Sequence, residues 1–150
     1  MIPDINLVVA ASRTDHVHHK QAIAWLNEAL AACDAGGGVE ILPMVAAGFL
    51  RLVTNARVFI RPTPVANAIE FIDALLKVPG VEMVENGREW PALRELCKTH
   101  SLAGNDIPDA WIAASVKALH GHLVTFDSGF TRWLGRGELS VLPANSPRLV

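Results

Sequence analysis

The sequence predicts an α/β fold, a three-layer α/β/α sandwich in which a central, mainly parallel sheet of four to five strands lies between helices. Short apolar segments typical of buried strands alternate with longer amphipathic segments along the whole chain. This alternation is the pattern of a parallel sheet that is covered on both faces. The 150 residues suffice for one sizeable core and leave no room for two ordinary ones. We therefore expect residues 1–150 to form a single domain.

The first half of the chain predicts two strands and four helices. Residues 1–4 and the apolar segment 5–11 form a buried strand that breaks at Asp4 into a buried helix. After a polar turn, the apolar spacing predicts a helix over 18–30 whose inward side chains are Ala22, Trp25, Leu26 and Leu30. The next segments are a strand over 39–43, a helix over 44–54, a basic loop over 55–63, and a helix that Thr63 and Pro64 cap and that runs to about residue 76.

The second half predicts three strands and two helices. A turn at Pro79 and Gly80 precedes a strand over 81–84 and a helix over 89–100. Pro108 suits the first position of a helix over 108–120, with Asp106 or Ile107 as its cap and Gly121 as its stop. Strands over 122–126 and 139–142 follow, and we expect the tail after residue 143 to be loose.

Composition excludes some classes of protein. Thirteen basic and 15 acidic residues give a formal charge of −2, so any surface that binds nucleic acid must be local. Cys33 and Cys97 lack metal-ligand spacing and form no disulfide framework, which indicates reduced thiols. Neither a leader peptide nor an apolar run of about 18 residues is present. We therefore expect a cytoplasmic protein without a membrane span.

Acidic residues gather where ligands bind to parallel sheets. Asp4 ends the first predicted strand and Asp127 ends the fourth, so both belong to one edge of the sheet. Asp106 and Asp109 lie at the mouth of the helix that precedes the fourth strand. Carboxylates that converge repel one another, and a divalent cation such as Mg²⁺ or Mn²⁺ removes this conflict. Such a cation activates a water molecule against a phosphodiester and stabilises the leaving oxygen.

Four segments carry a resemblance to a known family. They are Ile2-Pro3-Asp4-Ile5-Asn6, Phe49-Leu50-Arg51-Leu52-Val53-Thr54-Asn55, Gly104-Asn105-Asp106-Ile107-Pro108-Asp109-Ala110 and Thr125-Phe126-Asp127. In order and spacing the chain resembles the PIN domain, and more narrowly the VapC ribonuclease toxins of bacterial toxin–antitoxin pairs. The resemblance implies a PIN-like fold and a metal-dependent endoribonuclease that cleaves structured RNA such as tRNA or rRNA. It also implies a VapB-type antitoxin as partner and a homodimer.

The same resemblance assigns roles to individual residues. Asp4, Asp109 and Asp127 match the acids that hold the metal ion, and Asn6 matches a polar residue that supports the site. The family usually has a Glu just before the Phe-Leu-Arg motif, where this chain has Gly48. Either the site works with fewer acids, or Asp106 supplies the missing oxygen, or activity is weak. The second hypothesis is therefore a catalytically weakened PIN-like module that binds RNA or protein.

Each candidate also has an ordinary structural explanation. Asp106 could only cap a helix, Asp109 could be a first-turn carboxylate, and Asp127 could be a turn residue. Arg51, Arg57 and Arg61 bind RNA phosphates or are plain surface charge. A third hypothesis is a phosphatase-like or receiver-like domain with a phosphorylated strand-end acid, but no strand-end Asp is followed by the residues and the late Lys that this chemistry needs.

Histidines, tryptophans and apolar surface positions complete the predictions. The spacing of His16, His18 and His19 is poor for a closed metal site, so we expect solvated side chains. Trp25 and Trp111 lie on helices that need core, which favours packing over base stacking. Candidates for the antitoxin surface are Val17, Ala22, Leu26 and the segment 44–49.

Overall fold

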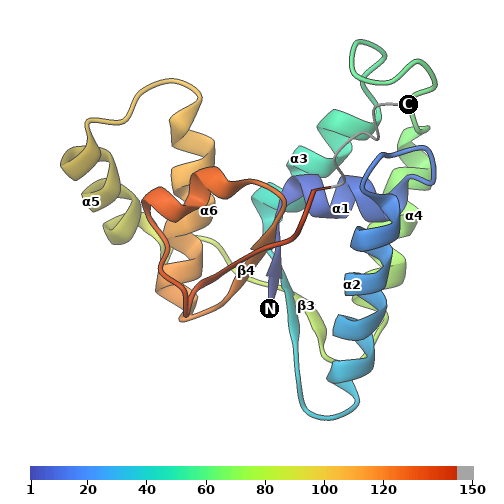
Figure 1. Ribbon diagram of the computed structural model, residues 1–150, viewed down its shortest axis with the longest axis horizontal. Helices are drawn as coiled ribbons and strands as arrows, with labels where there is room; N and C mark the ends of the chain where they lie inside the picture. The colour runs from blue at the N-terminus through green and yellow to red at the C-terminus, as the bar shows by residue number, and fades with distance from the viewer. Residues whose placement is uncertain (145–150) are drawn as a thin grey trace.

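All paired strands of the central sheet run parallel. The computed structural model describes residues 1–144, in which β1 (Ile2–Pro3), β4 (Leu123–Thr125) and β5 (Leu139–Val141) form one sheet in the order β1-β4-β5. β2 (Val39–Ile41) and β3 (Val81–Met83) form a second parallel pair. The backbone N–H of Glu40 donates to the Met1 carbonyl at 2.9 Å, so β2 adjoins β1 and the strands follow one another as β3-β2-β1-β4-β5 (Figure 1).

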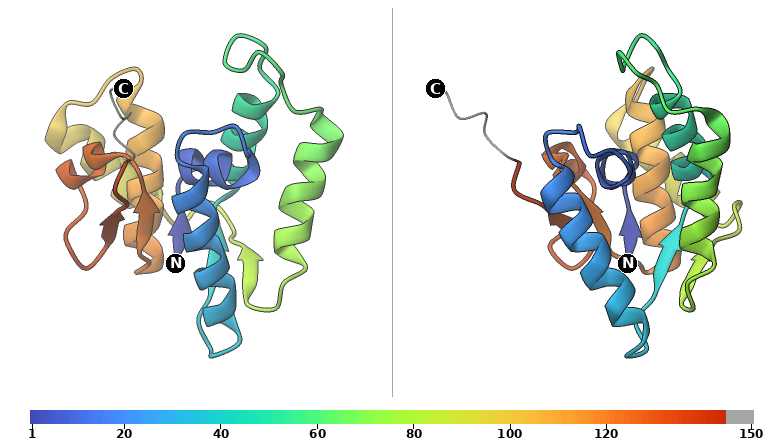
Figure 2. Two further views of the ribbon diagram at one scale, coloured as in Figure 1. Left: turned by 45° about the vertical axis from the view of Figure 1, so that its right-hand side comes forward. Right: turned by 90° about the vertical axis from the view of Figure 1, so that its right-hand side faces the viewer.

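Helices cover both faces of these strands (Figure 2). They are α1 (Ile5–Ser12), α2 (His19–Cys33), α3 (Pro43–Val53), α4 (Val65–Leu76), α5 (Trp90–His100), α6 (Asp106–Leu119) and the 3₁₀ helix η1 (Ser128–Arg132). Neighbouring residues on one strand face opposite sides, as Leu123 and Val124 of β4 do. Leu123 packs in a cluster with α3, α5 and α6, whereas Val124 packs in a second cluster with α1 and α2. The predicted α/β/α architecture is confirmed.

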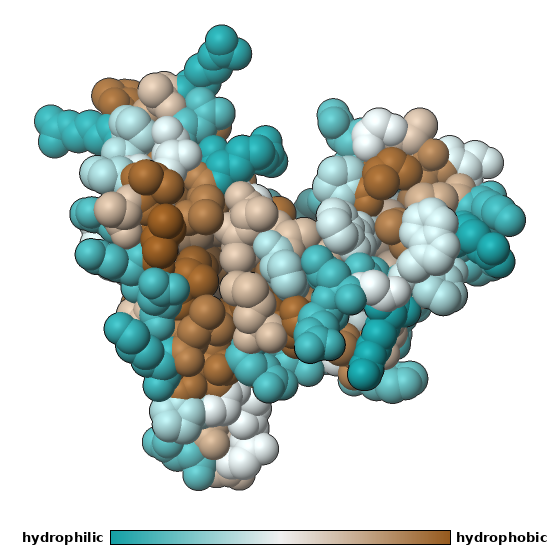
Figure 3. Space-filling view, turned by 180° about the vertical axis from the view of Figure 1, so that it is seen from behind, coloured by the Kyte–Doolittle hydropathy of each residue, from teal (hydrophilic) through white to brown (hydrophobic). Residues whose placement is uncertain are grey.

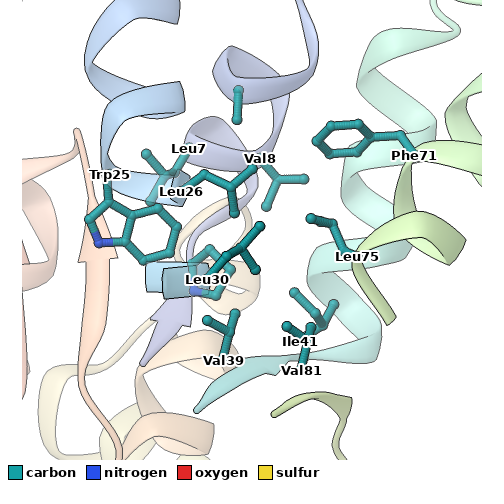
Figure 4. Close-up of a pocket in the computed structure, with 12 residues that line it drawn as sticks. Leu7, Val8, Trp25, Leu26, Leu30, Val39, Ile41, Phe71, Leu75 and Val81 are labelled. Carbon is teal, nitrogen blue, oxygen red and sulfur yellow. The ribbon is translucent and has the colours of Figure 1, made fainter. Parts of the chain in front are cut away.

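The second cluster is a well-packed part of the hydrophobic core. Side chains from α1, α2, α4, β2 and β3 converge in it, among them Leu7, Leu26, Leu75 and Val39 (Figure 4). A void of about 10 Å³ remains between them, which is room for about one water molecule. Trp25 belongs to this cluster, which confirms its predicted packing role.

The ends of α6 differ from the prediction. The helix begins at Asp106 with Asn105 at its N-cap position, so Asp106 lies inside the first turn and is not the cap. Pro108 still fits, because the first-turn N–H groups have no partner within the helix. At the other end His120, with φ of 51°, takes the left-handed position expected for Gly121. A Cβ on Gly121 would lie 2.6 Å from Ile2 Cδ1, so that glycine allows close packing against β1.

Other boundaries also shifted. α2 runs on to Cys33, and α3 begins at Pro43, which the prediction placed at the end of a strand. Pro64 stands at the N-cap of α4, but Thr63 does not cap this helix, because its hydroxyl accepts a hydrogen bond from Arg13 instead. The prediction for the tail concerns residues 145–150, which lie outside the described residues. In the described part of the chain, no helix has the length and apolar character that crossing a membrane requires.

Candidate active site

Asp4 connects β1 to α1 and anchors the site. Its φ of −77° and ψ of 162° suit an N-cap, and its Oδ1 accepts from the N–H of Ile5 at 2.6 Å. Parallel pairing with β4 sets its position, since the Asp4 N–H donates to the Val124 carbonyl at 3.0 Å. The side chain is buried, with 3% of its surface exposed. The start of α1 and the start of α6 lie at the same end of the molecule (Figure 1).

Thr125, the last residue of β4, links two of the predicted acids. Its buried hydroxyl donates to Asp4 Oδ2 at 2.8 Å and accepts from the backbone N–H of Asp127 at 2.9 Å. Asp127 Oδ1 in turn accepts from the Gly129 N–H at 2.7 Å, which caps η1. The sequence analysis gave Thr125 no role in the site. Its position one residue after the buried Val124, at the end of a strand, was the signal that it faces the acids.

The charges of the three acids act on one another, although burial has the larger effect on the pKa values of Asp4 and Asp109. Burial raises the pKa of Asp4 to about 6, and the charges of Asp109 and Asp127 add to this shift. Burial likewise raises the pKa of Asp109, helped by the charge of Asp127 and opposed by Arg132. Asp109 is half-buried in the first turn of α6, whereas Asp127 is exposed. The predicted meeting of Asp4 and Asp127 at one edge of the sheet is confirmed, and Asp109 joins them.

The donor set suits a hydrated cation better than a closed metal site. Within residues 1–144, no three His, Cys, Asp or Glu side chains are grouped closely enough to hold a metal ion alone. Mg²⁺ usually keeps several waters and takes one or two carboxylates directly. Burial is the main cause of the raised pKa values of Asp4 and Asp109, and a cation would relieve the repulsion between acids that adds to it. The carboxylates present therefore fit such an ion.

Asp106 has a different partner. Its Oδ1 accepts from Arg132 Nη2 at 3.1 Å, and both side chains are about half exposed. The guanidinium of Arg132 also lies 4.3 Å from the ring centroid of Trp133. An exposed ion pair of this kind stabilises a fold by about 0–1 kcal/mol. The carboxylate predicted to replace the missing Glu oxygen is thus engaged with Arg132, a residue that the sequence analysis did not single out.

Ile5 occupies the space beside Gly48. A Cβ on Gly48 would lie 2.5 Å from Ile5 Cδ1, so a larger residue there requires this side chain to move. An open groove of about 680 Å³ lies beside them and is lined by Ile5, Pro43, Met44, Ala47, Gly48, Arg51, Asn86, Asn105, Pro108, Trp111 and Ile112. The indole N–H of Trp111 donates to Glu89 Oε1 at 2.8 Å, which fixes one wall of the groove.

The predicted basic residues lie apart from one another. Arg51 lines the groove, whereas Arg57 and Arg61 are exposed on the loop between α3 and α4. Arg13, which the sequence analysis missed, holds this loop by donating to the Arg61 carbonyl at 3.0 Å and by lying 4.0 Å from the Phe59 ring centroid. Its side chain is buried, and Asp15 pairs with it at 2.7 Å.

Asn6 and three histidines lie on α1 and at or just before the start of α2. Asn6 is exposed on α1, and no side-chain hydrogen bond of Asn6 to the acids or to any other part of residues 1–144 is present. His16, His18 and His19, which were expected to be solvated, are partly buried and partly exposed. His19 Nδ1 lies 2.8 Å from the Ala10 carbonyl oxygen, so the ring ties α2 to α1.

Comparison with known proteins identifies the family. The PIN domain family matches residues 1–133. Ribonuclease VapC31 of Mycobacterium tuberculosis is 37% identical over 131 residues, which cover 87% of this chain and 90% of that protein. Ribonuclease VapC25 of the same organism is 36% identical with the same coverage, and Ribonuclease VapC43 is 38% identical over 87% of each chain.

Solved structures agree on the fold. The structure of VapBC2 from Rickettsia felis, bound to a DNA fragment from their promoter, superimposes with a TM-score of 0.63 at 18% identity and covers 93% of this chain and 96% of that one. FitAcB from Neisseria gonorrhoeae gives a TM-score of 0.56 at 16% identity, with coverage of 95% and 96%. The chain therefore belongs to the PIN domain family and, within it, to the VapC group.

Proposed function

We propose that this chain is a metal-dependent endoribonuclease, the toxin component of a type II toxin–antitoxin system. The observation that carries the proposal is a buried carboxylate, Asp4, held in place by two hydrogen bonds and subject to the charges of Asp109 and Asp127. The names of the relatives, which are ribonucleases, support this reaction. We also propose that the whole chain forms one domain and that the protein acts in the cytoplasm.

Asp4, Asp109 and Asp127 would hold Mg²⁺ or Mn²⁺. The bound ion would activate a water molecule and offset charge on the phosphodiester. The chain itself orients the carboxylates, since Thr125 and the Ile5 N–H fix both oxygens of Asp4 and the Gly129 N–H fixes Asp127. Fixing the carboxylates before the substrate binds lowers the reorganisation that the reaction requires.

A structured RNA such as tRNA or rRNA is the proposed substrate. Arg51, Arg57 and Arg61 are exposed on the side of α3 and of the loop that follows it, where they can bind phosphates. Exposed single-stranded loops are the parts of a folded RNA whose bases a protein can reach. The chain has a net charge of −2, so binding would depend on these separate exposed cations.

A VapB-type antitoxin and a second copy of the chain are the proposed partners. The solved neighbour is VapBC2 bound to a DNA fragment from their promoter, which supports an antitoxin as partner. Ala22 and Leu26 are buried, so the prediction that they face the antitoxin was wrong. Val17 stays exposed, and Met44 and Ala47 line the open groove, which we assign to the antitoxin. Copurification of the chain with a VapB-type protein, lost when Ala47 is replaced by Arg, tests this assignment.

The homodimer contact is assigned to an apolar band beside α4. Val65 and Ile69 of α4 and Met83 of β3 are exposed, and apolar atoms form a band down this side of the molecule (Figure 3). Large exposed apolar patches mark interaction surfaces in proteins of this size. Light scattering during size-exclusion chromatography should give a dimer for wild type and a monomer for Ile69→Asp; a monomeric wild type contradicts the assignment.

A weakened binding module is the second candidate. The observation that favours it is the contact between Gly48 and Ile5, which leaves an apolar side chain where the family usually has an acid. In this case the fold still presents the groove and the basic loop to RNA or protein, but hydrolysis is slow or absent.

Cleavage of total RNA separates the two candidates. Purified wild type is incubated with Mg²⁺ or Mn²⁺, or with excess EDTA, beside Asp4→Asn and the control Asp73→Asn, an exposed acid on α4. The nuclease predicts discrete products that disappear with EDTA and with Asp4→Asn but persist with Asp73→Asn. If the wild type forms no products, or if Asp4→Asn forms the same products, the proposal of a nuclease is contradicted.

A further inference from the structure

A second concave site lies directly beside the acids. It has a volume of about 420 Å³ and is lined by Asn6, His16, Val17, His18, Phe126 and Asp127. Asp127 belongs both to this pocket and to the acid cluster, so a molecule in the pocket would lie next to the phosphodiester that the acids act on. Pockets of this volume accommodate small organic molecules.

One wall of the pocket is an aromatic stack. The rings of His18 and Phe126 lie 4.7 Å apart between centroids with 26° between their planes. Phe126 directly follows the buried Thr125, and His18 directly precedes α2, so two distant segments build this wall. The ring of His16 lies 5.6 Å from that of His18 and is tilted by 56°. Flat π faces at the edge of a site are surfaces on which a nucleobase stacks.

The rest of the lining supplies hydrogen-bonding groups. The backbone N–H of His18 donates to His16 Nδ1 at 3.2 Å, so the proton of the neutral His16 ring is on Nε2, which is then a donor. Burial lowers the pKa of His16, which favours this neutral ring. The amide of Asn6 carries both a donor and an acceptor and makes no side-chain hydrogen bond within residues 1–144.

We propose that this pocket is a nucleobase subsite, in which the His18–Phe126 stack holds the base next to the scissile phosphate and Asn6 and His16 read its edge. The proposal rests on the proposed ribonuclease function and deepens it. A nucleobase is the ligand that matches a π face, a polar edge and the adjoining acids at the same time. Asn6 and His16 are thus the specificity-determining residues, whereas His18 and Phe126 hold whichever base is bound.

Binding of the four ribonucleoside 5′-monophosphates in EDTA tests the subsite without any cleavage. Side-chain ¹H–¹³C spectra of the six histidines report the ligand position. We expect the His16 and His18 signals to shift with one or two of the nucleotides, and His100, at the end of α5, to stay unchanged. His18→Ala should weaken binding by about 5- to 150-fold, the range for loss of one stacked base. His18→Phe should restore it to within about twofold.

A parallel cleavage assay separates the two proposals. His18→Ala should lower the cleavage of short single-stranded RNA and Asn6→Ala should change the preferred base at the cut, while His100→Ala leaves both as in wild type. If wild type cleaves RNA and His18→Ala binds nucleotides and cleaves as wild type does, the subsite is refuted and the nuclease stands. If nucleotides shift His16 and His18 but no RNA is cleaved, the nuclease fails and the subsite stands. If nucleotides shift neither histidine and no RNA is cleaved, both the subsite and the nuclease are refuted.

Discussion

The hydroxyl of Thr125 donates to the buried carboxylate of Asp4 at 2.8 Å across 121 positions of the chain. The same hydroxyl accepts from the backbone N–H of Asp127, so one side chain sets the positions of two acids. Parallel pairing of Pro3 with Val124 brings the strand ends together and makes this contact possible. Residues that orient the ligands of a metal site often matter nearly as much as the ligands.

Replacement of Thr125 tests this orienting role. Thr125→Val should lower Mn²⁺ affinity and RNA cleavage by about 10- to 100-fold, the usual effect of losing a residue that orients a ligand. It should also lower the free energy of unfolding by about 1–3 kcal/mol, because it leaves Asp4 Oδ2 buried without its donor. Thr125→Ser keeps the hydroxyl and should behave nearly as wild type in urea unfolding and in cleavage. Equal losses in both variants would contradict the role of the hydroxyl.

The raised pKa of Asp4 predicts a pH-dependent stability. Its pKa is about 6 in the folded chain against an ordinary 3.8, so the folded state binds the extra proton and stability falls as pH rises between these values. Each pKa unit corresponds to about 1.4 kcal/mol, so ionised Asp4 destabilises the fold above pH 6 by up to about 3 kcal/mol. Asp4→Asn should therefore be more stable than wild type at pH 7.5 and no more stable at pH 4. Urea unfolding at the two pH values checks this, and a gain of the same size at both would refute it.

Metal binding should appear as a rise in melting temperature. Mn²⁺ or Mg²⁺ that binds only the folded chain raises its stability by mass action. At pH 7.5 we expect a rise for wild type that excess EDTA reverses and that Asp4→Asn and Asp109→Asn each reduce. The rise should be smaller at pH 5, where Asp4 is mostly protonated. Asp73→Asn on α4 is the matched control, and equal rises in all four proteins would exclude a site at these acids.

An acid restored at position 48 should require the Ile5 side chain to move. Gly48→Glu alone places a Cβ 2.5 Å from Ile5 Cδ1 and should lower the free energy of unfolding by about 1–3 kcal/mol. Ile5→Ala removes the colliding atom, so the double variant should regain part of this loss in urea unfolding. If the missing acid limits activity, the double variant should also cleave RNA faster than Ile5→Ala alone. An unchanged rate would show that the three present acids set the activity.

Arg13 should control the loop between α3 and α4. Arg13→Gln removes the ion pair with Asp15 and the stack on Phe59, so the loop should open more often. Trypsin should then cut after Arg57 several-fold faster, as mass spectrometry of the fragments would show. Lys20→Gln, an exposed cation, serves as control. Equal cutting of the two variants would show that other contacts hold the loop.

Local patterns were enough for the order of the elements and for placing Asp4 and Asp127 at one edge of the sheet. Apolar periodicity and turn residues report short-range preferences, so each predicted helix and strand is present with ends shifted by a few residues. Asp4 and Asp127 were predictable because the end of a parallel strand is a position in the sequence as well as in space. Helix ends were less predictable: in α6 it is His120 and not Gly121 that takes the left-handed position, and both N–H groups bond back to carbonyls of the last turn.

Contacts between distant segments account for the rest. The bond from Thr125 to Asp4, the pairing of Arg132 with Asp106, the packing of Ile5 against Gly48 and the stack of His18 on Phe126 each join residues whose separation no local pattern encodes. They arise when the sheet pairs β1 with β4 and the helices close over it. The order of the chain therefore places Asp4 and Asp127 at one edge of the sheet, whereas packing decides how their side chains are held and what lies beside them.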